Sequence, residues 1–176
     1  MTPRGVQVGF EVEPLDTTKH DRESFTCGVP SLDGYLKKQA AQEMRRRVNA
    51  VFILVETRRP TAIAGYFTLC ASALEAGSVP ESARKHLPRY PLVSTTLIGR
   101  FAVAVGYQGR GLGAALLARA LRVAHSNAGT IGSCMVVVDA LNEKAAGFYG
   151  AHGFVRLPDS MRLILPMRTI GVLLGG

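Results

Sequence analysis

Apolar and polar positions follow two different periods along the N-terminal third of the chain. Residues 6–15 alternate with a period of two, which predicts a strand. Apolar residues recur four apart over residues 31–47, which predicts a helix with Ser31 as its N-cap. The apolar runs 50–57 and 62–72 flank the turn sequence RRPT and predict a hairpin of two buried strands.

The rest of the chain continues this mixture of periods. The predicted elements are a short helix over 79–88, a strand over 94–105, a helix with Leu112, Ala115, Leu116, Ala120 and Val123 on one face, a buried strand over 133–140, a helix over 142–153 ending at Gly153, and two short strands within 154–167. The segment after Met167 has no pattern that assigns it to an element. This order predicts an α/β (α+β) fold with helices packed on a mixed sheet.

Length and composition predict one globular domain over residues 1–176. The chain is 47% hydrophobic and 19% charged, and it contains no apolar run long enough to cross a bilayer. The N-terminus lacks the pattern of a secretory signal, so we expect a cytoplasmic protein without a membrane partner. Cys27, Cys70 and Cys134 are far apart in sequence, which favours reduced thiols over disulfides or a zinc site.

A net charge of +8 suggests a polyanionic partner. Two interpretations of the basic clusters remain open, because solvated surfaces and phosphate contacts both use such residues. The clusters contain Arg45, Arg46, Arg47, Arg58, Arg59, Arg84, Lys85 and Arg89.

The glycine-rich segment YQGRGLGAALLARAL, residues 107–121, contains two overlapping motifs. Gly109, Gly111 and Ala114 match the dinucleotide-binding pattern G-x-G-x-x-A, with Asp139 as a candidate ribose ligand. Against this reading, the five residues AVGYQ separate Val103 from the first glycine, and too few residues follow Asp139 for further βα units.

Gln108, Gly111 and Gly113 form the second motif, Q-x-x-G-x-G. Its glycines let successive backbone N–H groups approach one ligand, and the following helix adds its positive N-terminal end. This motif predicts a pyrophosphate site, although a turn that merely connects strand and helix would have the same composition.

Two segments in fixed order carry a family resemblance. VAVGYQGRGLGAALLARAL, after LIGRF, and the later VVVDALNEKAAGFYGAHGF resemble the acetyl-CoA-binding half of the GCN5-related N-acetyltransferases, the GNAT family. The resemblance extends from Leu97 to Phe154. It implies the GNAT fold, a mixed, mostly antiparallel sheet of six to seven strands flanked by helices, with acetyl-CoA as acetyl donor and no metal.

The resemblance also assigns the donor-binding residues. The strand around Phe101 to Val103 is expected to diverge from its neighbour and align the thioester, and the backbone N–H of Val103 is a candidate for stabilising the oxyanion. Asn142 is expected either to contact the pantetheine arm or to cap the following helix, and both roles are compatible. The full expected set is Phe101, Ala102, Val103, Gln108, Gly109, Arg110, Gly111, Leu112, Gly113, Ala114 and Asn142.

Tyr149 is the expected general acid, because it occupies the family's position for that residue. A phenol with a pKa near ~10 suits protonation of an alkyl thiolate. The alternative is a core aromatic residue beside Phe148. No carboxylate or histidine is an obvious base, which favours an α-amine with a pKa of ~8 over a lysine amine at ~10.4.

The N-terminal half narrows the resemblance further. The segment EPLDTTKHDRESFTCGVPSLDGYLKKQAAQEMRRRVNAVFILVE, together with AIAGYFTLCAS and LPRYPLVSTTLIGRFAV, resembles the acetyltransferase toxins of bacterial toxin–antitoxin pairs. The resemblance implies acetylation of aminoacyl-tRNA, blocked translation and a ribbon-helix-helix antitoxin. Ala104 departs from the acidic or polar residue that such toxins often carry there. The basic clusters would then contact the tRNA acceptor stem.

Other functions remain open at this point. One is a housekeeping N-acetyltransferase that acts on a protein or a small-molecule amine, and another is a non-catalytic module that binds acyl-CoA or nucleic acid. The sequence leaves both a monomer and a homodimer open. His20, Asp21 and Cys27 are close in sequence, but a buried thiol and a local turn are favoured over a metal site.

Overall fold

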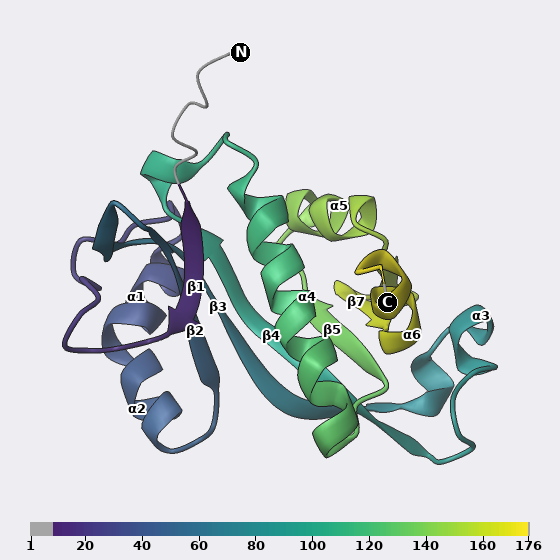
Figure 1. Ribbon diagram of the computed structural model, residues 1–176. Coiled ribbons are helices and arrows are strands. Elements are labelled where there is room, and N and C mark those ends of the chain that lie inside the picture. The colour runs from purple at the N-terminus through teal and green to yellow at the C-terminus, as the bar shows by residue number, and fades with distance from the viewer. Residues whose placement is uncertain (1–8, 176) are drawn as a thin grey trace, which may run out of the picture. The chain divides into compact units, whose positions relative to one another are not determined.

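The structure is a computed structural model that describes residues 9–175 (Figure 1). Its elements confirm the combination of strands and helices that the hydrophobic pattern predicts. In chain order they are β1 (Phe10–Pro14), α1 (Pro30–Lys38), α2 (Ala40–Arg45), β2 (Ala50–Glu56), β3 (Arg59–Glu75), the 3-10 turn η1 (Ala76–Ser78), α3 (Glu81–Arg84), β4 (Leu92–Val103), the 3-10 turn η2 (Val105–Tyr107), α4 (Leu112–Ile131), β5 (Met135–Asp139), α5 (Glu143–Ala151), β6 (Val155–Arg156), β7 (Arg162–Pro166) and α6 (Met167–Leu173).

Within the described residues, seven strands form one sheet in the order β1-β2-β3-β4-β5-β7-β6. The pairs β1/β2, β5/β7 and β6/β7 are antiparallel, whereas β4 and β5 are parallel over residues 95–98 and 135–138. A parallel pair needs a crossover connection, which α4 supplies. The mixed sheet predicted from sequence is confirmed, and it is not the doubly wound parallel sheet that the dinucleotide interpretation requires.

The chain forms two compact units. We call the first the N-terminal unit; it contains the described residues up to Thr68 together with Arg100–Leu116. The C-terminal unit contains Leu69–Gly99 and the residues from Leu117 onward. Strands β3 and β4 and helix α4 each contribute residues to both units.

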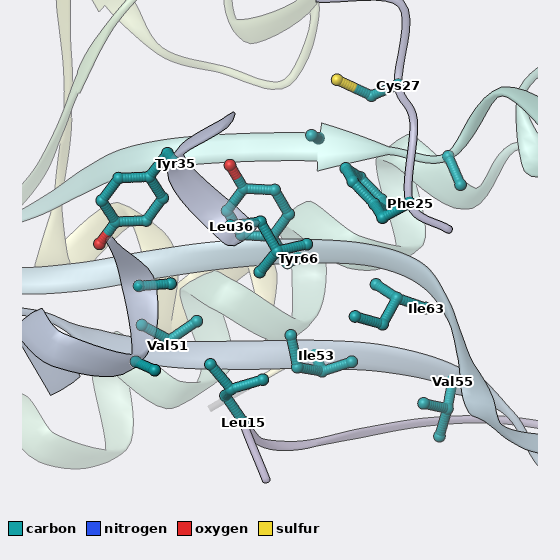
Figure 2. Close-up of a cluster of buried hydrophobic side chains, with 14 residues drawn as sticks. Leu15, Phe25, Cys27, Tyr35, Leu36, Val51, Ile53, Val55, Ile63 and Tyr66 are labelled. Carbon is teal, nitrogen blue, oxygen red and sulfur yellow. The ribbon is translucent and has the colours of Figure 1, made fainter. Parts of the chain in front are cut away.

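The core of the N-terminal unit lies between α1 and one face of its strands. Val51, Ile53 and Val55 alternate along β2, so their side chains share one face, where Figure 2 shows them beside other apolar side chains. Full burial of such a side chain contributes about 1.5–3 kcal/mol. The same cluster includes Ala102 and Ala104, so the end of β4 is anchored in this core.

The core of the C-terminal unit contains β5, which is buried on both faces. Met135 and the three valines that follow it are each at most 1% exposed, as expected for a central strand. Helix α6 occupies the segment that the sequence left unassigned. Its Ile170 is fully buried, and Met167 donates its backbone N–H to the carbonyl oxygen of Cys134 at 2.9 Å.

The predicted single helix over 31–47 is wrong in two respects. The structure contains two helices, α1 and α2, which are separated at Gln39. The N-cap of α1 is Val29 rather than Ser31, because Pro30 occupies the first helical turn, where its fixed φ and missing N–H are favourable. Apolar residues continue four apart across the break, so their spacing does not reveal it.

The remaining differences concern the ends of elements. The described part of the 6–15 prediction is β1, and residues 6–8 lie outside the described residues. The helix predicted over 79–88 is only the single turn of α3, Glu81–Arg84. The hairpin is confirmed as β2 and β3, with a shorter turn than RRPT.

Candidate functional site

The glycine-rich segment forms an open turn between β4 and α4. Gly109 and Gly111 have φ angles of 77° and 75°, in the left-handed region that other residues rarely adopt. A Cβ atom at either position would meet nothing within 4 Å. Backbone conformation, rather than lack of space, therefore requires glycine at both positions.

This turn presents several backbone N–H groups without intramolecular partners. Among the described residues 9–175, the N–H groups of residues 109–111 donate no hydrogen bond. The N–H groups of residues 112–114 belong to the first turn of α4, where no preceding helical carbonyl is available. A row of free donors at the start of a twenty-residue helix is suited to bind a phosphate or pyrophosphate.

The side chain of Gln108 holds the turn in place. Its amide nitrogen donates to the carbonyl oxygens of Val103 and Cys27, both at 2.9 Å. Val105 adds a third link, because its N–H donates to the carbonyl oxygen of Thr26 at 2.8 Å. The amide of Gln108 therefore ties the end of β4 and the turn to the loop before α1, a role that the motif alone does not indicate.

Arg110 places a positive charge beside the same turn. Its guanidinium carbon lies 5.3 Å from the centre of the Tyr107 ring. The Tyr107 hydroxyl donates to the carboxylate of Glu56 at 2.8 Å, and burial together with this carboxylate raises the pKa of Tyr107. The anchored ring gives the exposed Arg110 a fixed platform near the free N–H groups.

The end of β4 is in unusually close contact with β3. Ala104 donates its N–H to the carbonyl oxygen of Ala64 at 2.8 Å. A Cβ atom at Gly65 would lie 2.8 Å from the carbonyl oxygen of Ala102 and 3.2 Å from a methyl carbon of Leu116. Only glycine fits there, and a glycine inside an apolar strand was the available sequence signal for such close approach.

Asn142 is the N-cap of α5. Its Oδ1 accepts a hydrogen bond from the backbone N–H of Ala145 at 2.9 Å. One of the two roles expected from the sequence is therefore confirmed. Among residues 9–175 its amide NH₂ donates no hydrogen bond, and the expected contact with a pantetheine arm stays a prediction.

Tyr149 lies on α5 and is only 7% exposed. Its ring centre lies 5.3 Å from that of Phe148 and 5.5 Å from that of Phe154. Burial raises the pKa of the Tyr149 phenol well above its ordinary value, so the hydroxyl keeps its proton at neutral pH. The packing expected of a core aromatic residue is confirmed, and the role of general acid stays a prediction.

Asp139 forms an ion pair with Arg162, which belongs to the same unit. Arg162 donates two hydrogen bonds to its carboxylate, at 2.7 and 3.0 Å. The carboxylate that a dinucleotide site would direct at a ribose is therefore held in a bidentate ion pair.

The residues His20, Asp21 and Cys27 have separate partners. His20 contacts the carboxylate of Glu13 at 2.7 Å, and Asp21 accepts from the backbone N–H of Ser24. Burial raises the pKa of the Cys27 thiol to about 11, so it is not a thiolate at neutral pH. Within residues 9–175, no group of three histidine, cysteine or carboxylate side chains is arranged to hold a metal ion.

The expected site residues divide between the two units. Residues 101–103 and 108–114 belong to the N-terminal unit, whereas Asn142 and Tyr149 belong to the C-terminal unit. The basic clusters divide in the same way and are exposed. No helix in the described part of the chain combines the length and apolar character that a membrane span needs.

Comparison with known families decides the identity of the fold. The profile of the acetyltransferase (GNAT) domain matches residues 49–156, which is more than half of the chain. The chain belongs to the GNAT acetyltransferases. This confirms the family expected from the glycine turn and the segment that contains Tyr149, and it identifies the chain as an acetyl-transferring enzyme.

Relatives of this GNAT chain match it over nearly their whole length. It is 33% identical to the tRNA-acetylating toxin of Mycobacterium tuberculosis over 168 residues, which are 95% of this chain and 98% of that protein. The structure of AtaT complexed with acetyl-methionyl-tRNAfMet is 30% identical, with a TM-score of 0.86, and the match covers 94% of this chain and 99% of that one. A tyrosine-to-phenylalanine variant of KacT is 29% identical, with a TM-score of 0.87 and coverage of 93% and 98%.

A further AtaT structure contains the acetyl donor, acetyl-CoA. A tyrosine-to-phenylalanine variant of AtaT is bound to acetyl-CoA and to the C-terminus of the antitoxin AtaR. This structure is 27% identical to the GNAT chain, with a TM-score of 0.80 over 95% of this chain.

Sequence reasoning missed three features of the N-terminal unit. The links from Gln108 to Cys27 and from Val105 to Thr26 join segments far apart in sequence, and no local pattern predicts them. Arg100, which precedes the expected thioester-aligning residues, received no role although its guanidinium lies 3.9 Å from the ring centre of Tyr35.

Proposed function

We propose that this GNAT acetyltransferase transfers the acetyl group of acetyl-CoA to the amino group of an aminoacyl-tRNA and so blocks translation. The observation that carries the proposal is whole-chain similarity to proteins named for this chemistry. Both AtaT, solved with acetyl-methionyl-tRNAfMet, and the mycobacterial tRNA-acetylating toxin match at least 94% of this chain. A likeness confined to the acetyl-CoA-binding half would not distinguish this substrate from other amines.

The acetyl donor is proposed to bind at the end of β4 and the glycine turn. The free N–H groups of residues 109–114 are suited to donate hydrogen bonds to the pyrophosphate oxygens, and Arg110 adds positive charge for the phosphates. Among Phe101, Ala102 and Val103, the backbone groups that face away from β3 would pair with the pantetheine arm, and the free NH₂ of Asn142 would contact it. The family profile includes residues of both units, which supports a single acetyltransferase domain over residues 1–176.

The oxyanion is proposed to be stabilised by the backbone N–H of Val103. Backbone groups alternate in direction along an extended strand, and the N–H of Ala104 points to β3. The N–H of Val103 therefore points away from β3, on the same side as its own carbonyl, which accepts from Gln108. A fixed donor that is not used by the β3 ladder is suited to a charge that develops during the reaction.

Tyr149 is proposed to supply the proton for the leaving group. The amine nitrogen attacks the thioester carbonyl carbon, the C–S bond breaks, and the phenol protonates the departing thiolate. The attacking neutral amine loses one N–H proton to solvent as the amide forms, and the phenolate takes up one proton from solvent. Burial keeps the phenol protonated before the step, which an acid requires.

An α-amine acceptor fits the absence of an assigned base. The α-amino group has a pKa of ~8, so a useful fraction is neutral near pH 7.5, whereas a lysine amine at ~10.4 is almost fully charged. The acceptor stem would be held by phosphate contacts from the exposed basic clusters, which give affinity without reading sequence.

We also propose a partner and a cellular setting. AtaT has been solved with the C-terminus of its antitoxin AtaR, so we propose that an antitoxin neutralises this chain as well. We further propose that this antitoxin has a ribbon-helix-helix DNA-binding part and that the enzyme acts in the cytoplasm, where aminoacyl-tRNA is found. A homodimer and a monomer are both compatible with the proposal.

Cell-free translation tests the proposed function. Purified protein with saturating acetyl-CoA is expected to stop synthesis of a reporter, whereas the same protein without acetyl-CoA is not. Tyr149→Phe keeps the ring packing and is expected to leave synthesis nearly unaffected. Normal synthesis with the unaltered protein and acetyl-CoA would overturn the toxin function, and acetyl label in protein or small amines but never in tRNA would support a housekeeping transferase instead.

A further inference from the structure

Arg100 is a partly exposed cation on a rigid aromatic platform in the N-terminal unit. Its guanidinium carbon lies 3.9 Å from the centre of the Tyr35 ring. The Tyr35 ring stacks on that of Tyr66, with centres 6.4 Å apart, and Figure 2 shows both rings in the buried cluster. Each hydroxyl is hydrogen-bonded, Tyr35 to Glu43 and Tyr66 to the carbonyl oxygen of Leu32, both at 2.7 Å. The platform is therefore fixed at both rings.

The hydrogen-bond donors of the Arg100 guanidinium have no partner in the described structure. Among residues 9–175 the guanidinium donates no hydrogen bond and forms no ion pair. The carboxylate of Glu43, whose pKa the Arg100 charge helps to lower, accepts from Tyr35 and from Asn49 instead. Stacking uses the face of the guanidinium and leaves its edge, where the N–H groups point, available.

The position of Arg100 on β4 relates it to the proposed thioester-aligning strand. Arg100 and Ala102 are two residues apart, so their side chains leave β4 on the same face, about 7 Å from each other along the strand. Ala102 belongs to the same buried cluster as Tyr35. The backbone of Arg100 is fixed as well, because its N–H donates to the hydroxyl of Thr68 at 3.0 Å.

We infer that Arg100 binds the phosphodiester that precedes the terminal nucleoside of aminoacyl-tRNA. The inference rests on the proposed function. In aminoacyl-tRNA the amino acid is esterified, so it has no free carboxylate, and this phosphodiester is the first anionic group along the acceptor from the amine. A guanidinium binds phosphate oxygens through two parallel N–H bonds, a geometry that a stacked and unpaired arginine offers.

This contact would place the acceptor relative to the acetyl donor. A phosphate held beside Tyr35 fixes one end of the terminal nucleotide, while the esterified amino acid extends toward the thioester. The interaction is the same before and during acetyl transfer, so its loss raises KM more than it lowers kcat. Small acceptors that lack the phosphodiester gain nothing from Arg100.

The test compares two acceptors that differ in this phosphodiester. One is an aminoacyl-tRNA that the enzyme accepts, and the other is the matching aminoacyl-adenosine. For Arg100→Gln we expect KM for aminoacyl-tRNA to rise about 10- to 100-fold, the range for a hydrogen-bonded charge. The kinetics with aminoacyl-adenosine are expected to change less than twofold. The slope of log(kcat/KM) against log salt concentration is expected to fall by about 0.7–0.9, which corresponds to one phosphate contact.

Two further variants keep the test decisive. Arg122→Gln removes the same charge from an exposed position on α4 and is expected to leave KM for aminoacyl-tRNA within twofold. Arg100→Lys keeps the charge but loses the bidentate geometry, so we expect an intermediate KM; it replaces Arg100→Gln if that variant loses its thermal unfolding transition.

The possible outcomes separate this inference from the proposed function. Equal losses with both acceptors would assign Arg100 to structural support of Tyr35, and an unchanged KM for aminoacyl-tRNA would exclude the phosphate contact. Either result overturns the inference while tRNA acetylation by the unaltered enzyme still stands. If the unaltered enzyme acetylates no aminoacyl-tRNA, the proposed function itself fails.

Discussion

At the scale of single residues, Gln108 connects the glycine turn to two distant carbonyl oxygens. Gln108→Glu replaces the donating NH₂ by a carboxylate oxygen facing the carbonyl oxygens of Val103 and Cys27, so attraction becomes repulsion. Losing two hydrogen bonds of about 0.5–1.5 kcal/mol each is expected to weaken acetyl-CoA binding about 5- to 100-fold. Isothermal titration with acetyl-CoA measures this change.

A matched control for Gln108 lies on α2. Gln42→Glu introduces the same charge at an exposed position whose side chain is outside the turn, and we expect unchanged acetyl-CoA affinity. Equal affinities for Gln108→Glu and the unaltered protein would show that the turn keeps its shape without this side chain.

Tyr149 makes a prediction about pH. Burial raises the pKa of Tyr149 above its ordinary value of 10, so the acid stays protonated as the pH rises. We therefore expect kcat to increase as the pH rises through the amine pKa of ~8, with no decline at any pH up to about 10. Tyr149→Phe should lower kcat about 10²- to 10⁴-fold at every pH without weakening acetyl-CoA binding. An alkaline decline centred below pH 10, absent in Tyr149→Phe, would contradict the raised pKa.

The chemistry of single residues was predictable where it depends on backbone conformation or local capping. The glycine turn before α4 and the N-cap role of Asn142 follow from residue type and position. The partners of Gln108 and the platform under Arg100 were not predictable, because each joins segments that meet only after folding.

At the scale of elements, one carboxylate joins α1, α2 and the segment before β2. Glu43 accepts from the Tyr35 hydroxyl and the Asn49 amide, each at 2.7 Å, and both donors are buried. Glu43→Ala leaves these donors without their acceptor, so we expect a loss of about 1–3 kcal/mol in the free energy of unfolding. Chemical denaturation measures this loss.

Acid titration gives an independent check on the same contact. The hydrogen bonds from Tyr35 and Asn49 lower the pKa of Glu43 below its value in the unfolded chain, 4.5. The stability from this group is therefore complete above the unfolded pKa and is lost as pH falls through the folded pKa. Glu43→Gln should lose less stability than Glu43→Ala at pH 7 and show a shallower decline below pH 4.5. An identical acid decline in Glu43→Gln and the unaltered protein would exclude this role.

Close approach of β3 and β4 makes Gly65 sensitive to substitution. Gly65→Ala would place a carbon atom 2.8 Å from the carbonyl oxygen of Ala102, so β4 must shift. We expect about 1–3 kcal/mol of destabilisation and weaker acetyl-CoA binding. Gly34→Ala is the matched control, because nothing lies within 4 Å of its added Cβ and alanine in α1 should stabilise by about 0.5–1 kcal/mol. Similar unfolding midpoints for the two variants would contradict the tight contact.

Most elements were predictable because their apolar spacing reports one buried face. The break between α1 and α2 was not, since Leu36, Ala40 and Met44 keep helical spacing across it. Helix α6 was missed because it has only seven residues, and its two polar residues, Arg168 and Thr169, are adjacent and too few to define a helical period.

At the scale of the whole molecule, the family was predictable and the strand order was not. The glycine turn and the segment with Tyr149 are specific enough together to indicate a GNAT enzyme, as the match over residues 49–156 confirms. The order β1-β2-β3-β4-β5-β7-β6 depends on which apolar faces meet, and runs such as residues 135–138 do not specify their neighbours. The net charge of +8 indicates a polyanionic partner, and the proposed tRNA substrate is one.

Transfer of radiolabelled acetyl to aminoacylated tRNA tests the central claim most directly. The purified protein, acetyl-CoA labelled in the acetyl group and charged total tRNA are incubated together, and label is measured in precipitated tRNA before and after mild alkaline release of the aminoacyl ester. The account predicts label in charged tRNA that is released as N-acetyl-amino acid, with none in uncharged tRNA and a loss of at least 100-fold with Tyr149→Phe. No label in charged tRNA, with acetyl-CoA bound and the protein folded, would contradict it.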